Sequence, residues 1–173
     1  MSSGARGHGY CYFRHLPCLV AIALMLVGQL LNGQTNLLTN GGFELGNTSG
    51  WTAAGSTIAA STTEKRSGQY GGFVSGRTAE WHGAWLNGLQ SVLTSGKTYR
   101  VSLWIKPAAG SGLEVQLTTK QTNGGVDVYG PVLQQRVCTA GEWTELSGEF
   151  TYINPGDTSA LSIYVYCFDT MRR

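Results

Sequence analysis

The segment Ser75–Trp85, SGRTAEWHGAW, places one tryptophan before and one after His82, which is the only histidine after residue 33. A serine hydrolase needs a nucleophile, a base and an orienting acid, and the chain has no G-x-S-x-G motif to supply the nucleophile. Zinc sites gather several His and Cys ligands, and one histidine with two distant cysteines is a poor set. These residue types argue against both hydrolase and zinc chemistry.

The acidic residues make no better case for catalysis. A glycosidase needs two carboxyl groups about 5–10 Å apart, one on each side of the bond that is cut. The candidate acids instead have the spacing of ordinary solvated charges at strand edges. They are Glu142, Glu145, Glu149, Glu80 and Asp127. We therefore predict that this chain alone is not an enzyme.

Aromatic residues fit a binding role better, because the chain has five tryptophans and eight tyrosines but few charges. The segment LSIYVY, Leu161–Tyr166, alternates aliphatic residues with Tyr164 and Tyr166, so the tyrosines face outward if the aliphatic side chains form the core. Outward rings form a flat, partly apolar platform, which suits the apolar face of a sugar ring. The alternative is that these rings form cross-strand pairs that stabilise the sheet by about 0.2–1 kcal/mol each.

Other residues can be placed around such a platform. Trp81, Trp85 and Tyr129 are hard to bury together with the two tyrosines. The tryptophans predicted to anchor one sheet on the other in the core are Trp51, Trp104 and Trp143. The side chains that could form hydrogen bonds with sugar hydroxyls are Gln116, Gln134, Glu80 and Arg136.

The elements that must position these residues are short strands. YRVSLWIK, Tyr99–Lys106, and LEVQLTTK, Leu113–Lys120, alternate apolar and polar residues with period two. Turn signals such as Asn123-Gly124-Gly125 separate the alternating segments. No window after residue 35 keeps an apolar stripe at helical spacing. The pattern predicts one all-β domain, built as an antiparallel sandwich of two sheets.

The first 33 residues have the features of an export signal. Arg6 and Arg14 precede the apolar run Cys18–Leu31, and Gly33 suits a cleavage site. The alternative is an uncleaved membrane anchor, but the run is shorter than the ~20 residues needed to span a bilayer. We predict a signal peptide over residues 1–33 and a secreted, extracellular domain over residues 34–173, with no membrane association after cleavage.

Removal of the signal leaves a chain of nearly balanced charge. Two of the twelve basic residues are lost and none of the ten acidic ones, so no basic surface for nucleic acid is expected. Cys138 and Cys167 remain, as a disulfide in an oxidising compartment, as two buried thiols, or paired with another chain. Asn47-Thr48-Ser49 fits the acceptor pattern for N-glycosylation at Asn47.

Four segments together resemble carbohydrate-binding modules of the family 4/9/22 group, and most of all the family 22 xylan-binding modules of secreted xylanases. The resemblance covers residues 36–166. The segments are NLLTNGGFELGNTSGWTAAG, SGQYGGFVSGRTAEWHGAWLNGLQSVLTSGKTYRVSLWIK, GEWTELSGEFTY and ALSIYV. It implies a jelly-roll sandwich, like that of galactose-binding domains, with a groove across one sheet that holds a β-1,4-linked glycan.

The resemblance also assigns residues to that groove. Trp81 falls on the groove tryptophan, and Tyr129 and Tyr164 fall on two groove tyrosines. Two positions depart from the family pattern: Ala54 stands where the family has an arginine, and Tyr166 where it has a glutamate. A looser site for xylan, cellulose or mixed β-glucan is therefore expected. Trp85 is expected either beside Trp81 in the groove or in the core.

The end of the chain departs from the family as well. Glu44 matches a family ligand for a structural calcium ion, but the aspartate-bearing last strand that supplies its partner is missing. Asp169 could substitute for that aspartate, and the alternative is that Glu44 is a plain surface acid. A possible structural calcium and no required cofactor are therefore expected. The resemblance implies a C-terminally truncated domain, which lacks its last strand and comes from a larger enzyme.

The function expected from these observations is non-catalytic binding of plant polysaccharide, as the targeting module of a xylanase-type glycoside hydrolase. The alternative is an extracellular protein-interaction or adhesion domain on the same fold, because a jelly roll does not choose between functions.

Overall fold

The structure is a computed structural model that describes residues 27–28, 35–108 and 113–168. Within these ranges no helix is long and apolar enough to cross a membrane. The short strand β1 (Val27–Gly28) lies inside the predicted signal peptide and pairs with β6, Gly28 opposite Tyr99. The predicted signal peptide and the predicted loss of the last strand concern residues mostly outside the described ranges, so both stay predictions.

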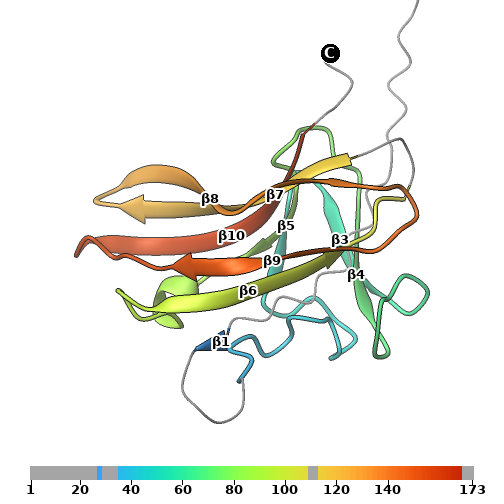
Figure 1. Ribbon diagram of the computed structural model, residues 1–173, viewed down its shortest axis with the longest axis horizontal. Coiled ribbons are helices and arrows are strands. Elements are labelled where there is room, and N and C mark those ends of the chain that lie inside the picture. Colours follow the sequence, from blue (N-terminus) through green and yellow to red (C-terminus); the bar gives the residue numbers. More distant parts are fainter. Residues whose placement is uncertain (1–26, 29–34, 109–112, 169–173) are drawn as a thin grey trace, which may run out of the picture.

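One layer of the fold is a five-stranded antiparallel sheet with the order β2-β5-β10-β7-β8. Its strands are β2 (Trp51–Ala54), β5 (Gly83–Leu86), β10 (Thr158–Phe168), β7 (Leu113–Asn123) and β8 (Val126–Cys138). Neighbours in this sheet come from distant parts of the chain, as the green β5 beside the red β10 shows in Figure 1. Residues far apart in the sequence therefore share one surface.

The other layer is made of two smaller antiparallel sheets. One has the order β1-β6-β9, with β6 (Thr98–Ile105) and β9 (Thr144–Thr151), and the other pairs β3 (Thr57–Ser61) with β4 (Gly71–Ser75). A short 3₁₀ helix, η1 (Leu89–Ser91), follows β5. The predicted all-β sandwich is confirmed, and Figure 1 shows β6 and β9 side by side in their layer.

The core between the layers is formed by the aliphatic faces of the alternating strands. Leu161, Ile163 and Val165 of β10 are buried there, as are Leu103 and Ile105 of β6. Burial of each such side chain contributes about 1.5–3 kcal/mol to the free energy of folding. Because side chains alternate across a strand, the residues between the aliphatic ones in β10 are directed to the outside of the five-stranded sheet.

Only one of the three tryptophans predicted for the core lies there. Trp51 stacks on Phe43 with ring centroids 5.1 Å apart, and its indole N–H donates to the carbonyl of Asn40. Trp104 lies on the outer face of β6, because it alternates with the buried Leu103 and Ile105. The prediction for Trp104 and Trp143 was wrong.

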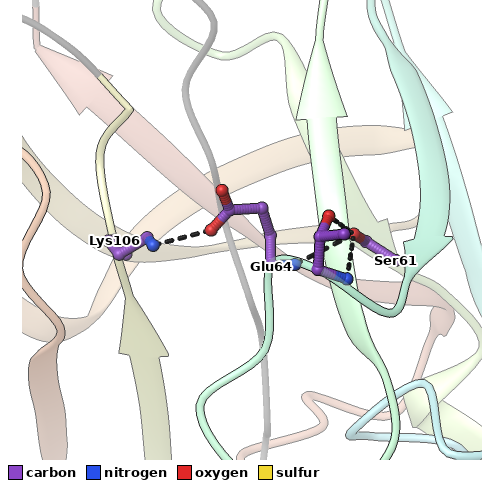
Figure 2. A network of polar contacts seen from close by, with 4 residues as sticks. Ser61, Glu64 and Lys106 are labelled. Carbon is purple, nitrogen blue, oxygen red and sulfur yellow. Dashed lines mark hydrogen bonds and ion pairs between the residues drawn. The ribbon is translucent and has the colours of Figure 1, made fainter.

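These two tryptophans are covered by cations instead of by the second sheet. The guanidinium of Arg66 lies 3.5 Å from the ring centre of Trp104, and Nζ of Lys106 lies 5.6 Å from that of Trp143. Lys106 also forms an ion pair of 2.6 Å with Glu64 in the loop after β3, and Figure 2 shows the two side chains pointing toward each other. This loop is thereby attached to the outer face of β6.

Candidate functional site

The outer face of the five-stranded sheet is hollowed into a groove of about 680 Å³. Its lining comes from four of the five strands and from the loop between β4 and β5. The lining residues are Trp81, Trp85, Gln116, Thr118, Lys120, Tyr129, Gly130, Pro131, Tyr164, Tyr166 and Phe168. Aromatic side chains dominate this list, so the groove presents an apolar surface with a few polar groups.

The floor of the groove contains a stacked pair of rings. Trp85 of β5 lies directly opposite Tyr164 of β10 in the strand register, and their rings stack with centroids 4.1 Å apart and an angle of 5° between planes. Tyr164 is only 4% exposed, although it lies outside the core cluster. This burial, with smaller contributions from Tyr129 and Tyr166, raises the pKa of Tyr164 to about 12. The neutral phenol is therefore the stable form in the groove.

Two further rings of β10 continue the floor. The ring of Tyr166 lies 6.5 Å from that of Tyr164 and 4.8 Å from that of Phe168. The Tyr166 hydroxyl donates to Oε2 of Glu80 over 2.5 Å. This hydrogen bond is the main reason that the pKa of Tyr166 is raised. Glu80 thus fixes the tyrosine that stands where the resemblance implied a glutamate.

The rims of the groove carry the exposed rings. Trp81, in the loop after β4, is 47% exposed, and Tyr129, on the edge strand β8, is 56% exposed. Both can offer ring surface to a ligand, whereas Tyr164 cannot offer much because Trp85 covers one of its faces. The register of β8 with β7 has two irregularities, between Val115 and Thr118.

Polar groups of the groove come mainly from β7. Gln116, Thr118 and Lys120 alternate with buried residues along this strand. Nζ of Lys120 forms an ion pair of 2.8 Å with Asp127. The hydrogen bond within this pair raises the pKa of Lys120 and lowers that of Asp127. The pair is neutral overall, so it leaves the groove without a net charge at this end.

The structure brings most of the predicted binding residues into one groove. Those that line it are Trp81, Trp85, Tyr129, Tyr164, Tyr166 and Gln116. Glu80 contributes through Tyr166, and the choice left open for Trp85 is decided in favour of the groove. Gln134 and Arg136 are exposed on β8 outside the lining, and Arg136 donates to the carbonyl of Glu145 over 2.7 Å.

Several lining residues were not predicted. Thr118 and Lys120 follow Gln116 at period two, and Phe168 follows Tyr166 at the same spacing. The alternation therefore could have predicted that they share a face with the predicted binding residues. Gly130 and Pro131 lie on β8 next to the irregularities in its register with β7, and the spacing of residues in the sequence does not predict these irregularities.

The other predicted sites lie elsewhere. Asn47 is exposed, and its side-chain oxygen accepts from the backbone N–H of Ser49. Cys138 and Cys167 are buried on β8 and β10, on opposite sides of β7. Two strand spacings come to about 9.5 Å, whereas bridged cysteines have Cα atoms about 4.4–6.8 Å apart. The register thus disfavours the disulfide, while glycosylation stays a prediction.

Glu44, the predicted calcium ligand, precedes β2. Its carboxylate accepts from the backbone N–H of Gln69 over 2.9 Å, and Asp169 lies outside the described residues. In the described part of the chain, no three His, Cys, Asp or Glu side chains gather as they would around a metal ion. Calcium also takes backbone and amide carbonyl oxygens as ligands, so the ion at Glu44 stays a prediction.

Comparison with known proteins shows the family of this chain. Residues 35–169 match the family model described as a carbohydrate binding domain. The chain belongs to this carbohydrate-binding domain family. The resemblance stated from the sequence is thereby confirmed, and so is the expectation of a binding module in place of a catalytic domain.

The chain is similar to short segments of much longer enzymes. It is 36% identical over 131 residues to endo-1,4-beta-xylanase A of Thermoanaerobacterium saccharolyticum, covering 75% of this chain and 11% of that enzyme. It is 30% identical over 138 residues to exoglucanase XynX of Acetivibrio thermocellus, covering 78% of this chain and 12% of that protein. The chain therefore spans about a ninth of the length of the curated relatives that it matches.

A solved structure supports the jelly-roll class of the fold. The module is similar to the CBM22-1 xylan-binding domain of Paenibacillus barcinonensis Xyn10C, with 28% identity and a TM-score of 0.66. This match covers 73% of this chain and 81% of that one. The jelly-roll sandwich expected from the sequence is confirmed.

Proposed function

We propose that the groove binds a β-1,4-linked plant polysaccharide, of the xylan or β-glucan type, by stacking sugar rings on Trp81 and Tyr129. The observation that carries the proposal is the exposure of these two rings at opposite rims of an apolar groove. A pyranose places C–H groups on its face and hydroxyl groups around its edge. Aromatic stacking can hold the face, while Gln116 and Lys120, the less buried polar side chains of the lining, can offer hydrogen bonds to the hydroxyls.

We expect the groove to accept more than one polysaccharide, because of the residues at the two positions that differ from the family pattern, Ala54 and Tyr166. Ala54 lies opposite Gly83 in the register of β2 and β5, where neither side chain can donate a hydrogen bond. Tyr166 adds a ring and is already bonded to Glu80. Few directional contacts remain for the distinction between one neutral β-1,4-glycan and another, so we expect weak binding to more than one of them.

The biological role that fits is that of a targeting module in a secreted glycoside hydrolase. The support is the similarity to small parts of an endo-1,4-beta-xylanase and of an exoglucanase. A module of this kind concentrates the enzyme on an insoluble polymer, and it needs no catalytic group of its own. Each aromatic contact contributes about 0.5–1.5 kcal/mol beyond the area that it buries.

Affinity electrophoresis tests the proposal. The module should migrate more slowly in native gels that contain xylan or mixed-linkage β-glucan than in gels without polysaccharide. Trp81→Ala and Tyr129→Ala should each weaken the retardation by roughly tenfold in apparent affinity, because 1.4 kcal/mol corresponds to a factor of ten. Trp143→Ala, directly before β9 and beside Lys106, is the matched control and should bind like the wild type.

Unchanged mobility of the wild type in both polysaccharide gels would count against the proposal and favour the adhesion alternative. Wild-type retardation of both the Trp81→Ala and Tyr129→Ala variants would place the glycan outside the groove.

A further inference from the structure

The loop that carries Trp81 is organised around one guanidinium group. Arg77 follows β4 and is half-buried. Its Nε donates to the carbonyl of His82, and its Nη2 donates to the carbonyls of Glu80 at 2.8 Å and Ala79 at 3.4 Å. The planar, permanently charged guanidinium can satisfy several acceptors at fixed angles, so a single side chain sets the course of the backbone on both sides of Trp81.

The carbonyl groups of this turn also accept from the sheet. The carbonyl of Glu80 accepts from the backbone N–H of Cys167 on β10 at 2.9 Å, and the carbonyl of Trp81 accepts from the indole N–H of Trp85 at 3.2 Å. Four consecutive carbonyls, from Ala79 to His82, thus have donors within the module. Because the backbone of the turn is held this way, the Trp81 ring is left at the rim of the groove.

His82 supports the same turn from its other side. Its Nδ1 accepts from the backbone N–H of Thr78 at 3.2 Å, and its ring meets the Trp81 ring edge-on with centroids 4.2 Å apart. A Cβ atom on Gly55 would come within 2.3 Å of the His82 ring. The loop after β2 therefore packs closely against His82 and leaves it little freedom to move.

We propose that Arg77 is a positioning residue for glycan binding: it holds the turn of residues 79–82 so that Trp81 is presented to the groove before a ligand arrives. The inference rests on the proposed function of the groove. A ring that is already held in its binding orientation loses less conformational freedom on binding than a mobile one. Arg77 itself is absent from the groove lining, so its effect on affinity must pass through the turn.

The test compares Arg77→Gln, Arg77→Lys and the control Arg100→Gln, whose arginine is exposed on the other layer. Titration with xylohexaose gives the affinity, and the indole N–H signal of Trp85 in NMR spectra reports on the Trp81 carbonyl that it donates to. Arg77→Gln should weaken binding about three- to tenfold, shift the Trp85 indole signal and speed the hydrogen exchange of the Cys167 amide. Arg77→Lys should fall between this variant and the wild type, and Arg100→Gln should change neither readout.

The outcomes separate this inference from the proposed function. If Trp81→Ala loses affinity but Arg77→Gln binds xylohexaose like the wild type, the positioning role is wrong and the groove stands. If Arg77→Gln binds weakly while the Trp85 indole and Cys167 amide signals stay unchanged, Arg77 acts by another route and the inference fails. If Trp81→Ala itself retains wild-type affinity, the proposed groove is at fault. If Arg77→Gln fails to fold, Arg77→Lys, which keeps the positive charge but lacks the guanidinium, is compared with the wild type by the same measurements.

Discussion

The aromatic residues of the groove differ widely in exposure. Trp81 and Tyr129 at the rims expose ring surface, while Tyr164 is almost fully buried under Trp85. The rim residues can therefore contribute to binding without much effect on folding. Tyr164 should instead contribute to the stability of the sheet and to the shape of the groove floor.

This division predicts opposite effects of two alanine substitutions. Tyr164→Ala should lower the free energy of unfolding by about 3 kcal/mol, because it removes a large buried ring and leaves a cavity. Trp81→Ala should change it by less than about 0.5 kcal/mol, as is usual for exposed positions. Urea unfolding of both variants measures the difference, and an equal loss in the two would contradict the assignment.

The raised tyrosine pKa values predict a loss of stability in alkali. Tyr164 has a pKa of about 12 in the fold against 10.0 for the free side chain, and the pKa of Tyr166 is shifted in the same direction. The folded state therefore holds these protons more tightly than the unfolded state. The stabilisation is complete below pH 10.0 and is lost as the pH rises toward about 12.

Unfolding measured across this range, together with tyrosinate absorbance, checks the effect. Tyr164→Phe and Tyr166→Phe should each make the free energy of unfolding fall less steeply with pH. If the free energy of unfolding of the double variant falls as steeply with pH as that of the wild type, groups other than these two tyrosines cause the loss of stability in alkali.

At the scale of elements, the hairpin between β7 and β8 depends on two glycines. Gly124 and Gly125 have φ angles of 53° and 82°, which suits the two-residue turn that matches the twist of paired strands. An added Cβ at Gly125 would meet nothing within 4 Å, so its substitution isolates the backbone strain. Gly125→Ala should cost about 1 kcal/mol, and Gly125→Asn less, since asparagine tolerates this conformation. Equal stability of Gly125→Ala and the wild type in urea would contradict the turn geometry.

Alternation predicted the strands and the face of each residue in β6, β7 and β10, because one sheet face is buried and the other is open. It did not predict how exposed each outward ring is, since the cover on Tyr164 comes from Trp85, far away in the sequence. Trp104 shows the same limit: its face followed from the pattern, but a large apolar residue was assigned to the core, whereas a cation from another loop covers it. The turn around Trp81 depends on side-chain hydrogen bonds from Arg77, for which spacing gives no signal.

For the whole molecule, the balance of charges predicts that glycan binding depends little on salt. The groove holds its lysine in an ion pair with Asp127, and the proposed ligand is neutral. Between about 0.02 M and about 0.5 M NaCl, a range that screens exposed charges strongly, the affinity for xylohexaose should change by less than about twofold. A steep decrease with salt would indicate that charges, and not rings, provide the attraction.

The five tryptophans sample the whole molecule: Trp81 and Trp85 line the groove, Trp51 lies in the core, and Trp104 and Trp143 lie under cations on the other layer. Titration of the labelled module with xylohexaose, followed by the five indole N–H signals, tests directly where the sugar lies. The signals of Trp81 and Trp85 should move with ligand concentration, while those of Trp104 and Trp143 stay in place. Movement confined to Trp104 and Trp143, or no movement in any of the five at saturating sugar, would contradict binding in this groove.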